Sequence, residues 1–181
     1  NWELQGGSLL RYAVQMGIIM GLPQLSEWAE MAFKQYPDSH VTQIDVNGML
    51  VQYYMRTYQW NKALKYSDAY WKGIQKFERG EFPIADFARI MSFYEPQAAR
   101  EGIAIMQADA CLHLKQYQLA KKVLEKVPLD TIGSGHIGSL INLIAQLSDK
   151  TNVSSLFIPA VSKVLETEPK TREEWSRQNV L

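Results

Sequence analysis

Apolar residues recur at intervals of three and four along almost the whole chain, and sustained alternation of apolar and polar residues is nearly absent. The first spacing places apolar side chains on one face of an α-helix, whereas alternation is typical of a β-strand. Glycine and proline divide the pattern into segments of helical length. The sequence therefore predicts an all-α fold in which short turns join consecutive helices.

The predicted helices pair into about four hairpins. An extra helix lies in an insertion, residues 79–96, between the second and third hairpins. We expect helices over residues 8–20, 23–36, 42–56, 60–77, 84–93, 97–114, 118–126, 139–147 and 152–166, a Gly-rich loop over residues 131–138 and a charged tail over residues 170–181.

The most apolar stretch runs from Leu9 to Leu22 and is interrupted by Arg11 and Gln15. It is shorter than the roughly 18–20 apolar residues that a bilayer span requires, so it is interpreted as a buried core helix. Residues 1–7 lack the basic start and apolar centre of a signal peptide. We therefore expect no membrane span and a cytoplasmic location. Because the sequence opens at Asn1 without Met, we also expect it to be a segment of a longer chain.

Composition restricts the class of partner. The chain of 181 residues carries 19 Lys and Arg against 19 Asp and Glu, and no basic block occurs in it. This balance counts against nucleic acid as a partner. The single cysteine, Cys111, excludes a disulfide framework and fits a reducing compartment. The length predicts one domain, residues 1–181, with a core that needs neither disulfide nor metal.

Two hairpins repeat the same pattern. Residues 60–65 (WNKALK) align with residues 117–122 (YQLAKK), 57 positions further along. An aromatic residue opens each second helix, and Ala63 or Ala120 follows one turn later. An alanine at the crossing allows two helices to approach to about 8–10 Å, while the aromatic residue is expected to wedge the turn against the preceding helix.

These positions resemble the tetratricopeptide repeat, whose units of about 34 residues are helix–turn–helix hairpins. The resemblance implies a right-handed superhelix, an α-solenoid of about four degenerate hairpins; the alternative is an irregular helical bundle. Within that family, the long spacing and the aromatic segments are similar to the helical region that follows the catalytic domain in some bacterial family 2 glycosyltransferases. The Asp-x-Asp signature of such a catalytic domain is absent from this chain.

Residues Gly133–Gly138 match the dinucleotide-binding spacing G-x-G-x-x-G. A buried strand should precede such a motif, but here the preceding segment is a predicted helix that Pro128 closes. A flexible connection is the favoured interpretation, and binding of an anion at the start of the next helix remains open.

Other chemistry-bearing residues do not assemble into a catalytic or metal-binding motif. His40, His113 and His136 are far apart in sequence, and Cys111 falls on the packed side of its helix, two residues from His113 on a different face. We therefore expect no catalytic residue, no metal, no cofactor and no enzymatic activity in this segment.

The tetratricopeptide resemblance implies that the first helix of each hairpin lines a concave groove. The groove positions are Asp45, Gly48, Gln52, Met55 and Arg56, then Gly102, Ile105, Asp109, Leu112 and His113, then Ser139, Asn142, Gln146 and Asp149. Gly48 and Ile105 stand where a carboxylate clamp for chaperone C-termini would have lysine, so a chaperone adaptor is not expected.

Gln52, Arg56, Asp109 and His113 are the predicted binding residues. The leading hypothesis is a non-catalytic scaffold whose groove contacts a protein or peptide, either a neighbouring domain of the same chain or another subunit. The alternatives are an accessory domain of a bacterial glycosyltransferase that positions the acceptor, and a peptide-sensing regulatory domain. The sequence leaves the oligomeric state open.

Overall fold

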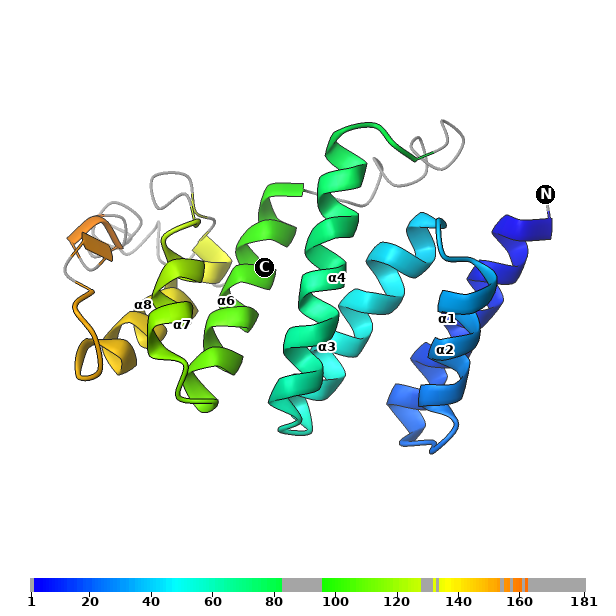
Figure 1. Ribbon diagram of the computed structural model, residues 1–181, viewed down its shortest axis with the longest axis horizontal. Coiled ribbons are helices and arrows are strands. Elements are labelled where there is room, and N and C mark those ends of the chain that lie inside the picture. Colours follow the sequence, from blue (N-terminus) through cyan, green and yellow to red (C-terminus); the bar gives the residue numbers. More distant parts are fainter. Residues whose placement is uncertain are drawn as a thin grey trace, which may run out of the picture.

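The computed structural model describes residues 2–82, 96–127, 132, 134–153, 155–156, 158–160 and 162 (Figure 1). Its elements are α1 (Trp2–Met20), α2 (Leu25–Gln35), the π-helix η1 (Val41–Val46), α3 (Asn47–Arg56), α4 (Trp60–Glu78), α6 (Pro96–His113), α7 (Tyr117–Leu124) and α8 (Ser134–Ser148). No strand occurs among the described residues, so the predicted all-α class is confirmed. The predicted helix over 84–93, most of the insertion and the charged tail lie outside the described residues.

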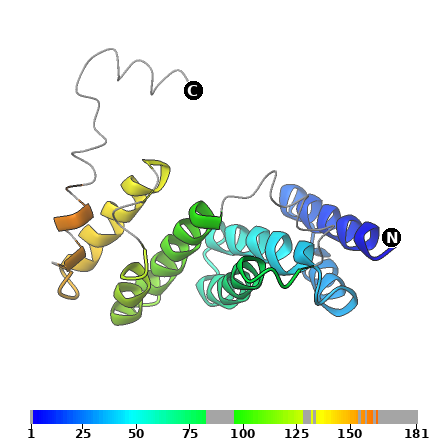
Figure 2. The same cartoon turned by 90° about the horizontal axis from the view of Figure 1, so that it is seen from above.

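Helices adjacent in sequence pack against each other. α1 packs on α2, α3 on α4, and α6 on α7, while α4 and α6 join one pair to the next. Figure 1 shows these helices in a row along the long axis of the molecule, and Figure 2 shows α1 and α3 on one side of the row with α2 and α4 on the other. The predicted hairpin order is therefore confirmed for these helices.

Four helix ends share one backbone conformation. Gly21, Tyr58, Gly80 and Lys115 have φ angles of 63°, 58°, 68° and 60°. In each case the next residue's N–H donates to the carbonyl five positions earlier, as in Gln59 to Tyr54 (2.9 Å) and Gln116 to Cys111 (2.8 Å). This bond and the left-handed residue define the Schellman termination of a helix. Because Tyr58 and Lys115 lie 57 residues apart, the sequence repeat is also a repeat of backbone conformation.

The buried side chains form clusters strung along the row of helices. Val14, Leu50 and Ala63 belong to a cluster between α1, α2, α3 and α4, and Ala120 and Leu140 to one between α6, α7 and α8. Ala63 is 1% exposed and Ala120 is fully buried, as expected for residues at helix crossings. The small residues that carry the sequence repeat are thus packing residues.

Replacing Ala120 with Leu should destabilise the protein by about 2 kcal/mol, because three additional carbon atoms must be accommodated between α6 and α7. Urea unfolding of the variant measures this loss. Leu119→Ala on the exposed side of α7 is the control and should change the free energy of unfolding by less than about 0.5 kcal/mol. An unchanged midpoint for Ala120→Leu would contradict tight packing at this crossing.

The segment before α3 differs from the sequence prediction. A continuous α-helix is expected over 42–56, but residues Val41–Val46 form a π-helix. The Asn47 side-chain amide donates to the Thr42 carbonyl (3.3 Å) and the Gln43 carbonyl (3.0 Å), so it occupies acceptors in this wider turn. On α4, Gly73 lies so close that a Cβ there would be 2.7 Å from the Gln43 carbonyl oxygen. Side-chain periodicity alone does not distinguish this turn from a regular one.

The predicted Gly-rich loop over 131–138 is wrong at its C-terminal half, because α8 already begins at Ser134. Ile137 and Leu140 are buried in the core cluster, and their burial outweighs the roughly 1 kcal/mol by which each glycine disfavours a helix. A Cβ at Gly135 or Gly138 would have no atom within 4 Å. These glycines are therefore not required for a close approach of any described group.

The interpretation of residues 9–22 as a buried core helix is wrong for one face of α1. Val14 is fully buried, but Leu9, Tyr12, Met16, Ile19 and Met20 are between 47% and 70% exposed. The sequence shows only that the helix is apolar on several faces, and the described packing covers one of them. Across the described residues, none of the helices combines the length and apolar character that crossing a membrane requires.

Candidate interaction site

The structure places the four predicted binding residues on two helices. Gln52 and Arg56 lie one turn apart on α3, and both are exposed. Asp109 and His113 lie one turn apart on α6, with 3.5 Å between the Asp109 Oδ1 and the His113 Nε2. The Asp109 side chain is 34% exposed and that of His113 46% exposed. The second pair therefore makes a direct polar contact that remains accessible to solvent.

Two aromatic residues from the α3–α4 turn extend this pair. The rings of Trp60 and His113 stack with centroids 4.0 Å apart and planes 3° from parallel. Tyr58 meets Trp60 edge to face, with centroids 5.6 Å apart. We refer to Tyr58, Trp60, Asp109 and His113 as the corner cluster. It joins the second hairpin to the third through side chains that lie at least 49 residues apart in sequence.

Trp60 makes one contact more than the sequence predicts. Its ring meets Tyr58 of the α3–α4 turn, in keeping with the expected contact with that turn, and it also stacks on His113 of the following hairpin. At the first position of α4 the indole reaches across the α4–α6 interface, where an imidazole of α6 offers a flat face. No short-range signal in the sequence connects these two residues.

Burial raises the pKa of Asp109, and the charge of His113 lowers it by a smaller amount. The folded protein therefore favours the protonated carboxyl more than the unfolded chain does. Stability falls as pH rises from the ordinary aspartate pKa through the raised value in the fold. At neutral pH the ionised Asp109 side chain therefore lowers the stability of the folded protein.

Asp109→Asn should therefore leave the protein at least as stable as wild type at pH 7, with a gain below about 1 kcal/mol because the group is partly solvated. The difference between the two proteins should shrink near pH 3.5, below the ordinary aspartate pKa, where the Asp109 carboxyl is mostly protonated. Urea unfolding at the two pH values measures the difference. A variant that is less stable at pH 7 would show that the contact with His113 outweighs the burial.

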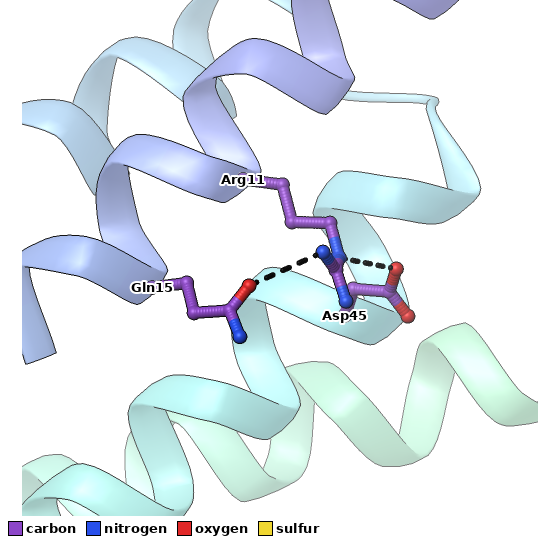
Figure 3. A network of polar contacts seen from close by, with 3 residues as sticks. All are labelled: Arg11, Gln15 and Asp45. Atoms are coloured by element: carbon purple, nitrogen blue, oxygen red, sulfur yellow. Dashed lines mark hydrogen bonds and ion pairs between the residues drawn. The ribbon is translucent and has the colours of Figure 1, made fainter. Parts of the chain in front are cut away.

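Of the other groove positions, Ile105 is wrong, and Gly48 and Asp45 contact neighbouring elements. A Cβ at Gly48 would lie 3.4 Å from the Tyr70 ring, so this position faces α4. Ile105 is 8% exposed and belongs to the core cluster. Asp45 accepts a hydrogen bond from the Arg11 Nε (3.0 Å), and Figure 3 shows Arg11 extending from α1 toward η1 to reach it. The phase of a regular hairpin would place these three residues in the groove, whereas in the structure they contact neighbouring elements.

A second polar cluster is buried between α6 and α8. Glu101 is 2% exposed, and its Oε2 lies 3.0 Å from the Nδ1 of His136. The Gln97 side-chain amide donates to the other carboxylate oxygen (3.0 Å), and Gly102 lies beside the imidazole ring. The sequence analysis includes His136 but misses Glu101. A signal was present, because Glu101 shares a helical face with Ile105 and Ala108, both buried.

Cys111 and the metal-binding side chains were the remaining candidates from the sequence. Cys111 is 1% exposed, and burial raises the pKa of its thiol to about 11, so the predicted core position is confirmed. Within the part of the chain that the structure describes, no group of three or more His, Cys, Asp and Glu side chains is placed to hold a metal ion.

A small cavity lies between α4, α6 and α7, where the Gln107 amide donates to the Asp68 Oδ1 (3.0 Å). Trp71 and Lys126 also line it, and its volume is about 70 Å³. Ligand pockets usually enclose roughly 300–1,000 Å³. This cavity is therefore large enough for water molecules but not for a cofactor or a metabolite.

Comparison with known proteins assigns no family. No protein-family model, no curated protein and no solved structure matches the chain. The tetratricopeptide resemblance therefore rests on the internal repeat of this chain.

Proposed function

We propose that this domain is a non-catalytic interaction module built from tetratricopeptide-like hairpins, and that it binds a peptide segment of a protein partner at the corner cluster. Gln52 and Arg56 extend the contact surface along α3. The partner segment belongs to another protein or to another domain of the same chain. The observation that carries the proposal is a cluster of aromatic, acidic and imidazole side chains that remains accessible to solvent, with Tyr58 76% and His113 46% exposed.

The repeat supports the proposed architecture. The α3–α4 and α6–α7 turns share a left-handed residue, a hydrogen bond across five residues and an N-cap glutamine of similar conformation, with φ and ψ of −94° and 64° at Gln59 and −89° and 57° at Gln116. Ala63 and Ala120 are buried at matching positions. Stacked hairpins use their sides for packing, which leaves the helix faces and turns for a partner.

Tyr58 supports the proposed site. Its φ of 58° belongs to the helix end that Gly21, Gly80 and Lys115 share, so the backbone alone does not distinguish it. Its ring does, because it meets Trp60 edge to face with centroids 5.6 Å apart. Tyr58 is also 76% exposed, so most of this aromatic surface is available to a partner. Asp109 gives separate support for the site, because the fold disfavours its ionised form and perturbed acidic groups concentrate at functional sites.

The chemistry of the site suits an extended peptide with mixed polarity. The Trp60 and Tyr58 rings offer apolar contact at a small loss of side-chain freedom. Asp109 can accept hydrogen bonds from partner N–H groups or pair with a basic side chain, whereas Arg56 can pair with a carboxylate through two hydrogen bonds. A peptide that presents a basic residue, an aromatic or aliphatic residue and an acidic residue in turn would match this order.

Selection from a random peptide library displayed on phage tests the proposal. The immobilised domain should enrich peptides with a shared pattern, and titration calorimetry should give a defined dissociation constant for the best one. His113→Ala and Arg56→Ala should each weaken binding about fivefold or more, since each removes a contact worth about 1 kcal/mol. Their melting temperatures should stay close to that of the wild type.

Lys122→Ala is the matched control, because Lys122 is an exposed cation on α7 away from the corner cluster. It should leave the affinity within a factor of two. The proposal fails if no peptide pattern is enriched, or if Lys122→Ala weakens binding while Arg56→Ala and His113→Ala do not.

A further inference from the structure

The exposed face of α1 carries a continuous apolar stripe. Leu9, Tyr12, Met16, Ile19 and Met20 follow one another at spacings of three, four, three and one residues, and are between 47% and 70% exposed. We call these five residues the α1 stripe. At 100° per residue they lie opposite Val14, which is fully buried against the rest of the hairpin. α1 is therefore apolar on two opposite faces, and the described packing covers one of them.

A helix that is apolar on opposite faces is characteristic of a buried helix. Five side chains of roughly 200 Å² each, at these exposed fractions, present roughly 600 Å² of surface. Contiguous apolar patches on monomeric proteins rarely exceed a few hundred Å². The α1 stripe therefore has the size of an interaction surface.

The stripe is also uncharged. Arg11 is the single charged residue between Leu9 and Leu22, and its Nε donates to Asp45 on η1. Arg11 also approaches the Gln15 side-chain oxygen at 3.5 Å, and Figure 3 shows both side chains on the side of α1 that faces η1. A helix that lies on an anionic membrane needs several Lys or Arg residues along its polar face. The charge pattern of α1 therefore favours a protein surface of the same apolar character.

We propose that two copies of this chain pair through the α1 stripe. The spacing of Leu9, Tyr12, Met16 and Ile19 is that of the a and d positions of a helix–helix seam. These four residues are separated by three, four and three positions, and this series is the same when the helix is followed from either end. A two-fold axis perpendicular to α1 would thus set Leu9 against Ile19 of the second copy and Tyr12 against Met16 of the second copy, in an isologous contact.

The area is sufficient for such a dimer. The four seam residues present roughly 500 Å² from each copy, or roughly 1,000 Å² in total, which is the threshold for a specific protein interface. An interface of this size and apolar character is consistent with a reversible dimer. Pairing through α1 leaves the corner cluster between α4 and α6 free, so the two surfaces can be tested separately.

Sedimentation equilibrium of the whole chain, from about 1 to 100 µM, tests this inference. We expect a reversible monomer–dimer equilibrium for the wild type. Met16→Glu places two unpaired carboxylates in an apolar seam and should raise the dimer dissociation constant about 100-fold or more. Leu119→Glu is the matched control, because Leu119 and Met16 are both 47% exposed, and it should change the constant less than threefold.

A pair of double variants tests the antiparallel arrangement. Tyr12→Glu with Met16→Lys brings opposite charges together across the two-fold axis, whereas Tyr12→Glu with Met16→Glu brings like charges together. The first should dimerise at least about tenfold more tightly than the second. Circular dichroism melts should show that all variants remain folded.

Three results would overturn the inference: a wild-type chain that remains monomeric over this range, Met16→Glu dimerising as well as the wild type, or equal loss of dimer in Leu119→Glu. Equal dimerisation of the two double variants would overturn the two-fold geometry. Monomers that bind to lipid vesicles would place a membrane on the stripe instead.

Discussion

Gly73→Ala should destabilise the protein by about 3 kcal/mol. A Cβ on Gly73 would lie 2.7 Å from the Gln43 carbonyl oxygen and 3.0 Å from its carbon, distances at which backbone atoms must move apart. The contact joins α4 to the π-helix η1, so relief of the clash requires a shift of η1 or of α4 within a packed core. Chemical denaturation with urea measures the loss.

Gly138→Ala is the control for the same substitution in a helix. No atom lies within 4 Å of a Cβ at this position, so the change should remove backbone freedom from the unfolded chain and stabilise the protein by roughly 0.5–1 kcal/mol. Opposite signs are therefore expected for two glycine-to-alanine changes in helices. A gain in stability for Gly73→Ala would contradict the close approach of α4 to η1.

His136→Ala should destabilise the protein by about 2–3 kcal/mol. The imidazole lies 3.0 Å from the Glu101 carboxyl group, which is 2% exposed, and its removal leaves a buried polar group with fewer partners. His113→Ala should cost less than about 1 kcal/mol, because that imidazole is exposed and contributes mainly its stacking on Trp60. Thermal and urea unfolding of both variants give the comparison.

The double variant Glu101→Gln/His136→Ala separates loss of the polar contact from loss of packing. If the buried carboxylate causes the cost of His136→Ala, the double variant should be more stable than the single variant. A double variant that is less stable than either single change would show that the imidazole acts through its volume. That result would contradict the account of the α6–α8 contact as a polar pair.

Sequence reasoning located most helices because their signals are local. The predicted helix over residues 8–20 ends where α1 does, at Met20 before Gly21, and α4 begins at Trp60 as expected. The spacing also predicts the burial of Ala63 and Ala120, because the residue at a helix crossing must be small for the two helices to approach. Helix ends and crossings depend on few residues that are close in the chain, which is why the pattern contains them.

Other features depend on contacts between distant residues. The π-helix η1 lies in close contact with Gly73, which is 30 residues beyond Gln43. The start of α8 at Ser134 depends on the core that Ile137 enters, so the glycines gave the wrong signal. Periodicity marks a helix as apolar but does not tell which of its faces the fold covers, as the exposed side of α1 demonstrates.

The candidate site was predicted in part. Asp109 and His113 were selected as exposed polar residues of one helix, and the structure places them in contact with each other. Tyr58 and Trp60 join them through the α3–α4 turn and were not among the predicted binding residues. Ile105, predicted in the groove, lies in the core, and Gly48 lies beside the Tyr70 ring of α4. The phase of a regular hairpin does not predict these contacts, because they depend on residues that are distant in the sequence.

The most direct test of the proposed interaction site is a nuclear magnetic resonance titration of the tryptophan indole N–H signals. A Trp60→Phe variant identifies the signal of Trp60 among those of the five tryptophans. Addition of the tightest-binding selected peptide should shift the Trp60 signal more than any other, with a midpoint that matches the calorimetric dissociation constant. If the peptide binds with an unshifted Trp60 signal, the partner surface lies elsewhere and the assignment of the corner cluster is wrong.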